Sequence, residues 1–244
     1  TILCLGDYVG YYYEPEKCID LLIKEKAICI KGNHEDIFLE ILKNKKKLPL
    51  FITKYGNGIN LAIKKLKTKH INFIKKLKVN KEIVIDNLKF LLSHGSPWDP
   101  NLYIYPNKFK NYIDKFKKYK CDFILLGHTH IQMKKKMKKN IILNPGSVGQ
   151  PRDGDYLAKW AIIDTKTKNF TYGKEFDVGK NTKVRINANK GTAKGSGGKS
   201  KTKGGEISIS KTFSDGGLVK NATPINVSGV TEPSIATIKI SKLI

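Results

Sequence analysis

Residues 123–130 read FILLGHTH, a short apolar run that ends in a glycine and two histidines. A continuous apolar run of this length, closed by a turn residue, is typical of a buried strand. His128 and His130 stand two positions apart and would point to opposite faces of an ideal strand. We therefore expect the strand to end at Leu126, and Gly127 to let the chain turn so that both imidazoles reach one site. Chance gives Gly-His-x-His only about once in a hundred chains of this composition.

Three other apolar runs end in polar residues in the same way. Asp7 follows ILCL at residues 2–5, Asn33 follows AICI at residues 27–30, and His94 follows FLL at residues 90–92. Because ligands of α/β sheets bind at the carboxyl ends of strands, we expect these side chains to meet. A carboxylate, an amide oxygen and imidazoles together suit Mn, Fe, Co, Ni or Zn. The fifth histidine, His70, lies in a helical stretch, and we expect it at the surface.

Amphipathic stretches separate the apolar runs. Helical patterns cover residues 14–26, 35–43, 58–77 and 108–119. Further strands are expected at residues 83–85, 90–92, 141–143, 157–163 and 170–172. Strands that alternate with helices and are followed by a strand-rich end predict a layered α/β fold with a mixed sheet.

The polar motifs, in this order, resemble the signature of the calcineurin-like metallophosphoesterases, and most of all the small prokaryotic phosphodiesterases among them. The motifs that carry the likeness are GDYVG (6–10), GNHE (32–35), SHGSP (93–97), GHTH (127–130) and NPGSVGQPR (144–152). The likeness spans roughly residues 1–177. It implies a four-layer α/β/β/α sandwich with a site for two divalent ions, drawn from Mn, Fe, Ni, Co or Zn.

The resemblance also implies a role for each site residue. The implied metal ligands are Asp7, Asn33, His94, His128 and His130. Asp7 would bridge the two ions, three of the other residues would complete one ion's shell, and His130 would join Asp7 on the second ion. His34 resembles the histidine that does not bind metal and assists the leaving group. The implied reaction is hydrolysis of a phosphoester, by in-line attack of a metal-bridging hydroxide on phosphorus.

Each of these residues also has a plainer interpretation. Asp7 and Asn33 could shape turns, and His94 could be a buried histidine with its hydrogen bonds satisfied. The segment 144–149 could be a structural turn, and Arg152 could contact substrate phosphate or lie on the surface. The five motifs together favour the metal site over these alternatives.

The function suggested by the motifs has two alternatives. One is a non-catalytic scaffold for protein interaction on the same fold, and the other is a nuclease of the same superfamily. A scaffold needs no positioned proton donor, so the presence of His34 favours an enzyme.

The chain departs from the family pattern at its beginning. The superfamily starts with an Asp-x-His motif on its first strand, and the 244 residues do not contain it. We therefore expect a strand and a crossover helix of roughly 30 residues before Thr1. On this interpretation the sequence is an N-terminally truncated fragment with impaired activity.

Composition limits the partners and the compartment. The net charge is +25, and only Arg152 and Arg185 are arginines. Because nucleic-acid recognition favours arginine, we interpret the lysines as solvated faces rather than a nucleic-acid groove. No apolar run approaches the ~18 residues of a membrane span, and no signal peptide is visible. Four cysteines without a Cys-x-x-Cys pair are typical of free thiols in the cytoplasm.

Composition also divides the chain. Residues 1–177 hold all the histidines and cysteines and form the predicted catalytic domain. Residues 178–205, rich in Gly, Lys, Ser and Thr, are expected to be a flexible linker. Residues 206–244 are a tail of unknown role in which short alternations, at 207–209 and 238–240, predict weak strands.

Overall fold

The computed structural model of the chain describes residues 1–154, 157–175, 185–186, 207–208 and 238–239. The helices are α1 (Pro15–Lys24), α2 (Asn33–Lys43), α3 (Leu48–Tyr55), α4 (Gly58–Lys65), α5 (Thr68–Lys76) and α6 (Ile113–Phe116), with 3-10 turns at Lys45–Lys47 and Phe109–Tyr112. The strands are β1 (Leu3–Cys4), β2 (Ile28–Cys29), β3 (Asn80–Ile85), β4 (Leu88–Ser93), β5 (Phe123–Leu125), β6 (Gln132–Lys136), β7 (Ile141–Pro145), β8 (Ala158–Ile163), β9 (Phe170–Glu175), β10 (Arg185–Ile186), β11 (Ile207–Ser208) and β12 (Ile238–Lys239). This arrangement confirms the predicted α/β class.

A five-stranded mixed sheet forms the centre of the fold, with the order β3-β4-β5-β7-β6. Its inner strands β4, β5 and β7 run parallel, and the outer strands β3 and β6 pair antiparallel with their neighbours. The inner strands are the apolar runs of the sequence, because a parallel strand is covered on both faces. Their shared direction brings the segments after β4 and β5 to one edge.

Two smaller sheets face this centre. Strands β1 and β2 pair in parallel, with Cys4 opposite Cys29. Strand β8 pairs antiparallel with β9 on one side and with β12 on the other. The segment after β1 carries Gly6 and Asp7, and the segment after β2 leads into α2 at Asn33.

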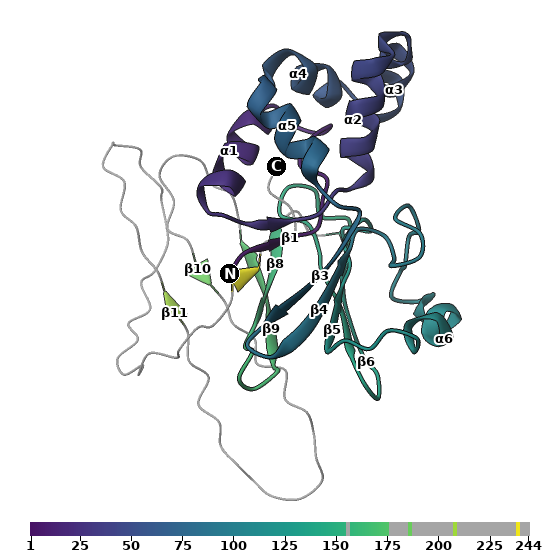
Figure 1. Cartoon of the computed structure of the whole chain (residues 1–244), viewed down its shortest axis with the longest axis vertical. Helices are drawn as coiled ribbons and strands as arrows, with labels where there is room; N and C mark the ends of the chain where they lie inside the picture. Colours follow the sequence, from purple (N-terminus) through teal and green to yellow (C-terminus); the bar gives the residue numbers. More distant parts are fainter. Residues whose placement is uncertain (155–156, 176–184, 187–206, 209–237, 240–244) are drawn as a thin grey trace, which may run out of the picture.

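Three apolar clusters show how the layers stack. The first lies between β1/β2 and the helices α1, α2, α4 and α5, the second between the sheets, and the third between the five-stranded sheet and α6. Along β5 the side chains alternate, since Phe123 and Leu125 enter the second cluster and Ile124 enters the third. This period of two is what a strand covered on both faces requires. Figure 1 shows the resulting order of helices, sheets and helix.

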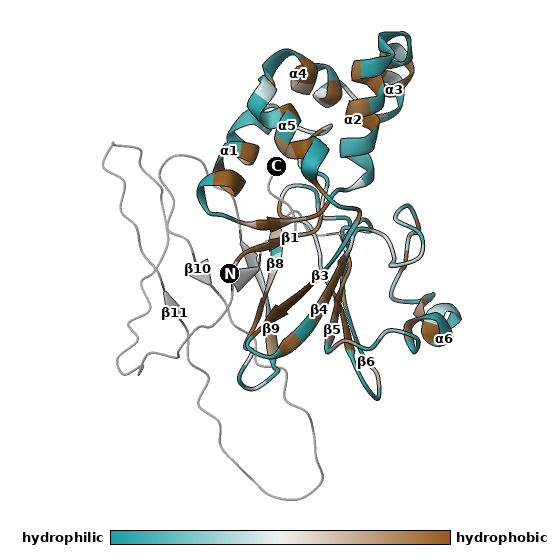
Figure 2. Ribbon diagram, viewed as in Figure 1, coloured by the Kyte–Doolittle hydropathy of each residue, from teal (hydrophilic) through white to brown (hydrophobic). Residues whose placement is uncertain are grey.

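The helices cover their layer with one apolar face each. The buried residues of α1 are Pro15, Cys18, Ile19 and Leu22, at the i, i+3, i+4, i+7 spacing of a single helix face. Figure 2 shows the same two-sided pattern, with hydrophobic and hydrophilic segments alternating along α1 to α5.

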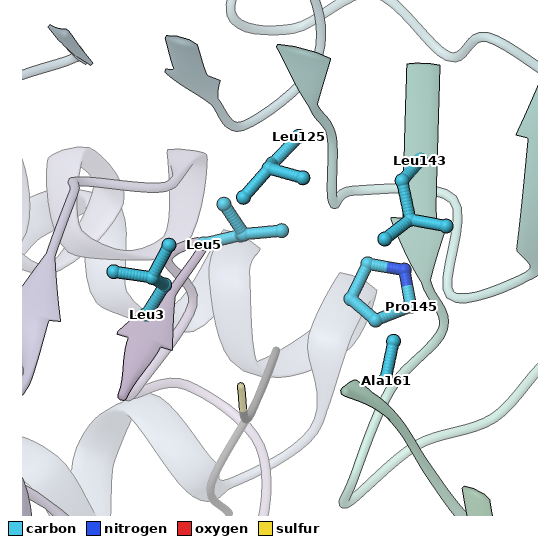
Figure 3. A pocket seen from close by; sticks show the side chains of 6 residues that line it. All are labelled: Leu3, Leu5, Leu125, Leu143, Pro145 and Ala161. Carbon is cyan, nitrogen blue, oxygen red and sulfur yellow. The ribbon is translucent and has the colours of Figure 1, made fainter. Parts of the chain in front are cut away.

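A small gap remains between the layers, where β1, β5, β7 and β8 approach one another (Figure 3). It has a volume of ≈ 10 Å³ and is lined by Leu3, Leu5, Leu125, Leu143, Pro145 and Ala161. Since a water molecule needs polar partners, an apolar cavity of this size stays dry. It therefore belongs to the core and does not form a ligand site.

The structure differs from the sequence-based expectation in three elements. Helix α3 and strand β6 were not predicted, and the helix expected over residues 108–119 is reduced to the 3-10 turn Phe109–Tyr112 and α6. Strand β6 reads QMKKK, so it contains no apolar run from which a strand could be predicted. It lies at a sheet edge, where lysines are common.

Most of the predicted linker 178–205 and tail 206–244 lies outside the described residues. Within the described part of the tail, β11 and β12 fall at the two alternations noted in the sequence. The division into domain, linker and tail stays a prediction. Among the residues that the structure describes, no helix is both long and apolar enough to cross a membrane.

Candidate metal centre

Asp7 lies in the turn that follows β1, and its side chain is buried. Gly6 and Asp7 have φ angles of 92° and 64°, in the left-handed region that glycine and aspartate tolerate best. The carboxylate points at the start of α2, where its Oδ1 accepts a hydrogen bond of 3.1 Å from the backbone N–H of His34. A Cβ on Gly32 would lie 2.3 Å from the same oxygen, so this close approach requires glycine.

Glu35 holds this turn in place, a role that the sequence analysis missed. Its fully buried carboxylate accepts hydrogen bonds from the backbone N–H groups of Asp7 (2.7 Å), Tyr8 (2.6 Å) and Gly32 (2.8 Å). One side chain thus joins the turn after β1 to the N-terminus of α2. Burial and the charge of Asp7 raise the pKa of Glu35 to about 7. The sequence signal that could have pointed to Glu35 is an acidic residue in the first turn of a helix, directly after His34.

Asn33, His94 and His128 converge on Asp7. The Nε2 atom of His94 lies 3.3 Å from Asp7 Oδ1 and 3.0 Å from His128 Nδ1. The Oδ1 atom of Asn33 lies 3.1 Å from His94 Nε2. Asp7, His94 and His128 are all buried, and one ligand atom of each lies within 4.8 Å of the others. The four strand ends identified in the sequence therefore meet at one point.

The second ring nitrogen of each site histidine lies against a main-chain carbonyl. His94 Nδ1, His128 Nε2 and His130 Nδ1 lie 2.6, 3.1 and 2.6 Å from the carbonyl oxygens of Leu5, Asn101 and Gln150. A carbonyl oxygen only accepts, so these nitrogens carry the proton and the other nitrogen presents a lone pair. This other nitrogen of His94 faces the oxygens of Asp7 and Asn33, and that of His128 faces His94 Nε2. A buried group of facing acceptors fits a bound cation, and the carbonyl contacts fix each ring as in metal sites.

His130 lies at the other side of Asp7. Its Nε2 is 4.0 Å from Asp7 Oδ2, and its side chain is buried. Both His128 and His130 have positive φ angles, of 62° and 60°. The chain has therefore left the strand conformation, as the sequence predicted, and His94 and His130 approach different oxygens of the Asp7 carboxylate.

Asn144 supports the loop that carries these two histidines. Its buried side chain donates hydrogen bonds to the carbonyl of Gly127 (2.6 Å) and to Thr129 Oγ1 (3.0 Å). Its Oδ1 accepts from the backbone N–H of Gly146 at 2.9 Å. The segment 144–149 therefore has the structural role considered in the sequence analysis, with Asn144 as its main contact to the site.

The charges at the site favour a bound cation. Burial and the neighbouring His94 lower the pKa of His128 to about 3, so this ring is neutral and offers a lone pair. Burial also opposes the charge of His94, but the charge and hydrogen bond of Asp7 outweigh it and raise the pKa of His94. The carboxylate thus stabilises positive charge at the centre of the cluster.

His34 is adjacent to the cluster, and its ring packs against aromatic side chains. The ring is buried and packs on Tyr11 and Tyr55, with centroid distances of 4.2 and 5.2 Å. A Cβ on Gly10 would lie 2.4 Å from His34 Nδ1, so the turn after β1 also confines this ring. The backbone of His34 contacts Asp7, whereas its imidazole lies among aromatic side chains.

Arg152, which follows the segment 144–149, contacts Tyr11 of the same aromatic group. Its Nη2 donates hydrogen bonds to Tyr11 Oη (3.1 Å) and Gln150 Oε1 (2.9 Å), and its side chain is exposed. Burial raises the pKa of Tyr11 to about 12, so the phenol stays protonated and accepts from the guanidinium. Arg152 is thus an accessible cation beside Tyr11, whose ring packs on His34, and its backbone N–H donates to the carbonyl of His130.

The expectation for His70 was wrong. Its side chain is 1% exposed, its Nδ1 accepts from the backbone N–H of Lys67 at 3.0 Å, and its Nε2 lies 3.1 Å from Asp20 Oδ1. The ring closes the N-terminus of α5 and bridges to α1. A histidine three residues after the N-cap of a helix can replace a capping glutamate, which the hydrophobicity pattern does not reveal.

A sequence profile of the family described as "Calcineurin-like phosphoesterase superfamily domain" matches residues 1–168. An uncharacterized protein of Methanocaldococcus jannaschii is 34% identical over 181 residues, which cover 68% of this chain and 71% of that protein.

Two solved structures show a similar fold. A metallophosphoesterase from Sphaerobacter thermophilus matches 70% of this chain and 75% of its own with a TM-score of 0.55 and 24% identity. A hypothetical protein from Pyrococcus horikoshii matches 70% of this chain and 73% of its own with a TM-score of 0.55 and 18% identity.

Proposed function

Because the chain belongs to the calcineurin-like phosphoesterase superfamily, whose members are metal-dependent, we propose that it hydrolyses phosphodiesters with two divalent ions held around Asp7. The observation that carries this proposal is the convergence of Asp7, His94 and His128, with their ligand atoms within 4.8 Å of one another. The sequence motifs that resemble small prokaryotic phosphodiesterases support a diester rather than a monoester.

The residues divide between two ion positions. Asp7, Asn33, His94 and His128 would hold one ion, because Asp7 Oδ1, Asn33 Oδ1 and His128 Nδ1 lie 3.3, 3.1 and 3.0 Å from His94 Nε2. Asp7 Oδ2 and His130 would hold the other. Ions at these positions would lower the pKa of a water molecule, the nucleophile for in-line attack on phosphorus, and neutralise the phosphoryl oxygens.

His34 would then act as the general acid. An imidazole titrates near neutral pH and can give a proton to the departing oxygen. Its ring is held by Gly10, Tyr11 and Tyr55, so it has few alternative orientations. The hydrogen bond from its backbone N–H to Asp7 keeps the acid at a fixed distance from the metal ligands.

Arg152 would bind the phosphoryl group. It is exposed beside the site, and its guanidinium can form paired, charge-assisted hydrogen bonds with phosphate oxygens. Since Tyr11 and Gln150 already hold one terminal nitrogen, the group is oriented before substrate arrives.

The test is hydrolysis of bis(p-nitrophenyl) phosphate with Mn²⁺, beside the monoester p-nitrophenyl phosphate. We expect faster hydrolysis of the diester, loss of activity with a chelator, and recovery when Mn²⁺ is added back. His34→Ala should lower kcat by about 10²–10⁴-fold, as is usual for loss of a general acid. Its Mn²⁺ affinity should stay unchanged, whereas Asp7→Asn should lose both activity and Mn²⁺ binding.

His70→Gln is the matched control, because His70 is buried but lies in α5, away from the site. It should lower the melting temperature and leave kcat unchanged. Activity that survives the double change Asp7→Ala and His34→Ala would contradict the assigned roles.

A further inference from the structure

Aromatic rings surround the metal centre, and the proposed reaction does not use them. Tyr103 follows β4, and its ring centroid lies 3.8 Å from that of His128, with 33° between the planes. Tyr105 stacks beside it at 5.9 Å and 12°. Tyr103 is 41% exposed, whereas His128, on which its ring packs, is buried. Tyr103 therefore forms part of the surface next to a predicted metal ligand.

A second aromatic group borders the site at His34. Tyr11 follows β1 and Tyr55 ends α3, and both rings contact His34. Phe51, one turn before Tyr55 on α3, stacks on it at 5.9 Å and 14°. No residue of α3 is fully buried, although the helix reads LPLFITKY. This helix thus packs Leu48, Phe51 and Ile52 against the first apolar cluster and places the Tyr55 ring at the border of the site.

The aromatic rings come from three separate segments, yet all border the same polar centre. A site that binds only a phosphoryl group needs positive charge and hydrogen-bond donors, which Arg152 and ions held by the metal ligands would provide. Partly exposed tyrosines add flat apolar surface, and such surface is suited to stacking against a planar ring. Aromatic platforms beside cationic groups are the usual means of binding nucleobases that are attached to phosphate.

We propose that the substrate is a phosphoester that carries a planar aromatic group of the nucleobase type, and that this group stacks on Tyr103. The proposal rests on the proposed function for the position of the phosphate, which lies at the metal centre beside Arg152. The second aromatic group, at His34, is then left to line the exit of the departing group.

The plainer interpretation is that Tyr103 only shields His128 from water. In that case removal of the ring would weaken metal binding, and the preference among phosphate ligands would stay the same. The two interpretations therefore predict changes in different measurements.

The experiment compares two ligands that differ only by the base, adenosine 5′-monophosphate and ribose 5-phosphate. Their affinities for the Mn²⁺-loaded chain are measured by calorimetry, with chromatography to check that both ligands remain intact. We expect the adenine ligand to bind roughly tenfold more tightly, or about 1.4 kcal/mol. In Tyr103→Leu this ratio should fall below about twofold, with ribose 5-phosphate and Mn²⁺ affinities unchanged. Tyr13→Leu, at the most exposed of the described tyrosines, should keep the tenfold ratio.

Each other outcome overturns the proposal. Equal affinities in the unchanged protein, or no binding of either ligand, show that no base is recognised. A ratio that persists in Tyr103→Leu shows that the base does not stack on this ring, and weaker Mn²⁺ binding in the same variant assigns the ring a shielding role. Because binding is measured without turnover, a base preference without phosphodiester hydrolysis would refute the proposed function and leave this inference standing.

Discussion

Replacing Asn144 tests whether the histidine loop is held by a side chain of the neighbouring strand. The change Asn144→Leu keeps a similar shape and removes three hydrogen bonds, to Gly127, Thr129 and Gly146. The carbonyl of Gly127 still accepts from the backbone N–H of Thr129, and Thr129 Oγ1 still accepts from that of Ile131, so the cost is that of the hydrogen bonds themselves. Each hydrogen bond contributes about 0.5–1.5 kcal/mol. We therefore expect the free energy of unfolding to fall by about 3 kcal/mol, less any gain from the added apolar surface.

Asn140 provides the matched control on the same hairpin. Asn140→Leu makes the same chemical change immediately before β7, at a side chain that is also buried. The side chain of Asn140 donates one long hydrogen bond of 3.3 Å to Tyr119, and its Oδ1 is buried without a partner. Replacing a group that is already poorly satisfied can be nearly neutral. The difference between the two variants cancels the gain from the leucine and should be about 2–3 kcal/mol.

The assays are urea unfolding followed by circular dichroism and Mn²⁺ binding by calorimetry. With a denaturant slope near 2 kcal/mol per M, the midpoint of Asn144→Leu should lie about 1 M below that of Asn140→Leu. Loss of a residue that supports metal ligands typically costs 10–100-fold in metal affinity, and we expect this only for Asn144→Leu. Equal midpoints and equal Mn²⁺ affinities in the two variants would refute the supporting role.

Three further outcomes are expected from close contacts and burial. Gly10→Ala should lower kcat at least tenfold, because its Cβ would lie 2.4 Å from the His34 ring. The Mn²⁺ affinity of this variant should stay within twofold of the unchanged protein, and a loss of Mn²⁺ binding would refute the reasoning. Gly32→Ala should abolish Mn²⁺ binding in the same assay, since its Cβ would lie 2.3 Å from the Asp7 carboxylate, and retained binding would show that the turn adapts. Burial raises the pKa of Cys121 to about 11, so its alkylation by iodoacetamide should be slow at pH 7.5. The alkylation rate should rise about tenfold per pH unit up to pH 10, and a rate that does not depend on pH would contradict this.

The positions of the predicted metal ligands could be deduced from the sequence because two simple rules act together. Apolar runs mark buried strands, and parallel strands bring the residues at their carboxyl ends to one edge of the sheet. His94 and His128 each come within three residues of the end of such a run in one sheet, so their proximity follows from the topology, whereas Asp7 follows β1 of the facing sheet and meets them through the packing of the two sheets. The turn between His128 and His130 was also deducible, because two ligands at i and i+2 cannot both face one site from a strand.

The supporting residues could not be deduced, since their roles depend on where the backbone turns. Glu35 reads as an ordinary acidic residue in the first turn of a helix, yet its carboxylate binds the turn after β1, more than 25 residues away in sequence. Asn144 reads as a turn residue before proline and glycine, yet it holds a loop from another strand. In both cases the signal is a buried hydrogen bond across elements, which has no periodicity along the chain.

Helix α3 and His70 were misjudged for a related reason. The sequence LPLFITKY has no polar face, so the amphipathic criterion fails for a helix whose side chains lie at the border of a site. His70 occupies a position where hydrophilic residues usually face water, but here its ring caps a helix and contacts Asp20. Tertiary contacts decide both cases, and local pattern does not.

The metal centre and its aromatic border are held by different kinds of contact. Each site histidine is oriented by a backbone carbonyl, as His94 is by Leu5 after the first strand and His128 is by Asn101 in the loop that also carries Tyr103. A backbone carbonyl remains when a side chain is replaced, so the substitution of Tyr103 leaves the hydrogen bond that orients His128. Tyr103 and Tyr55 contribute only their side chains to the border, from that loop and from the end of α3. Substitutions of these tyrosines should alter the surface beside the phosphate and leave the metal ligands in place. We therefore expect Tyr103→Leu to change the preference among substrates and Asn144→Leu to change the affinity for Mn²⁺.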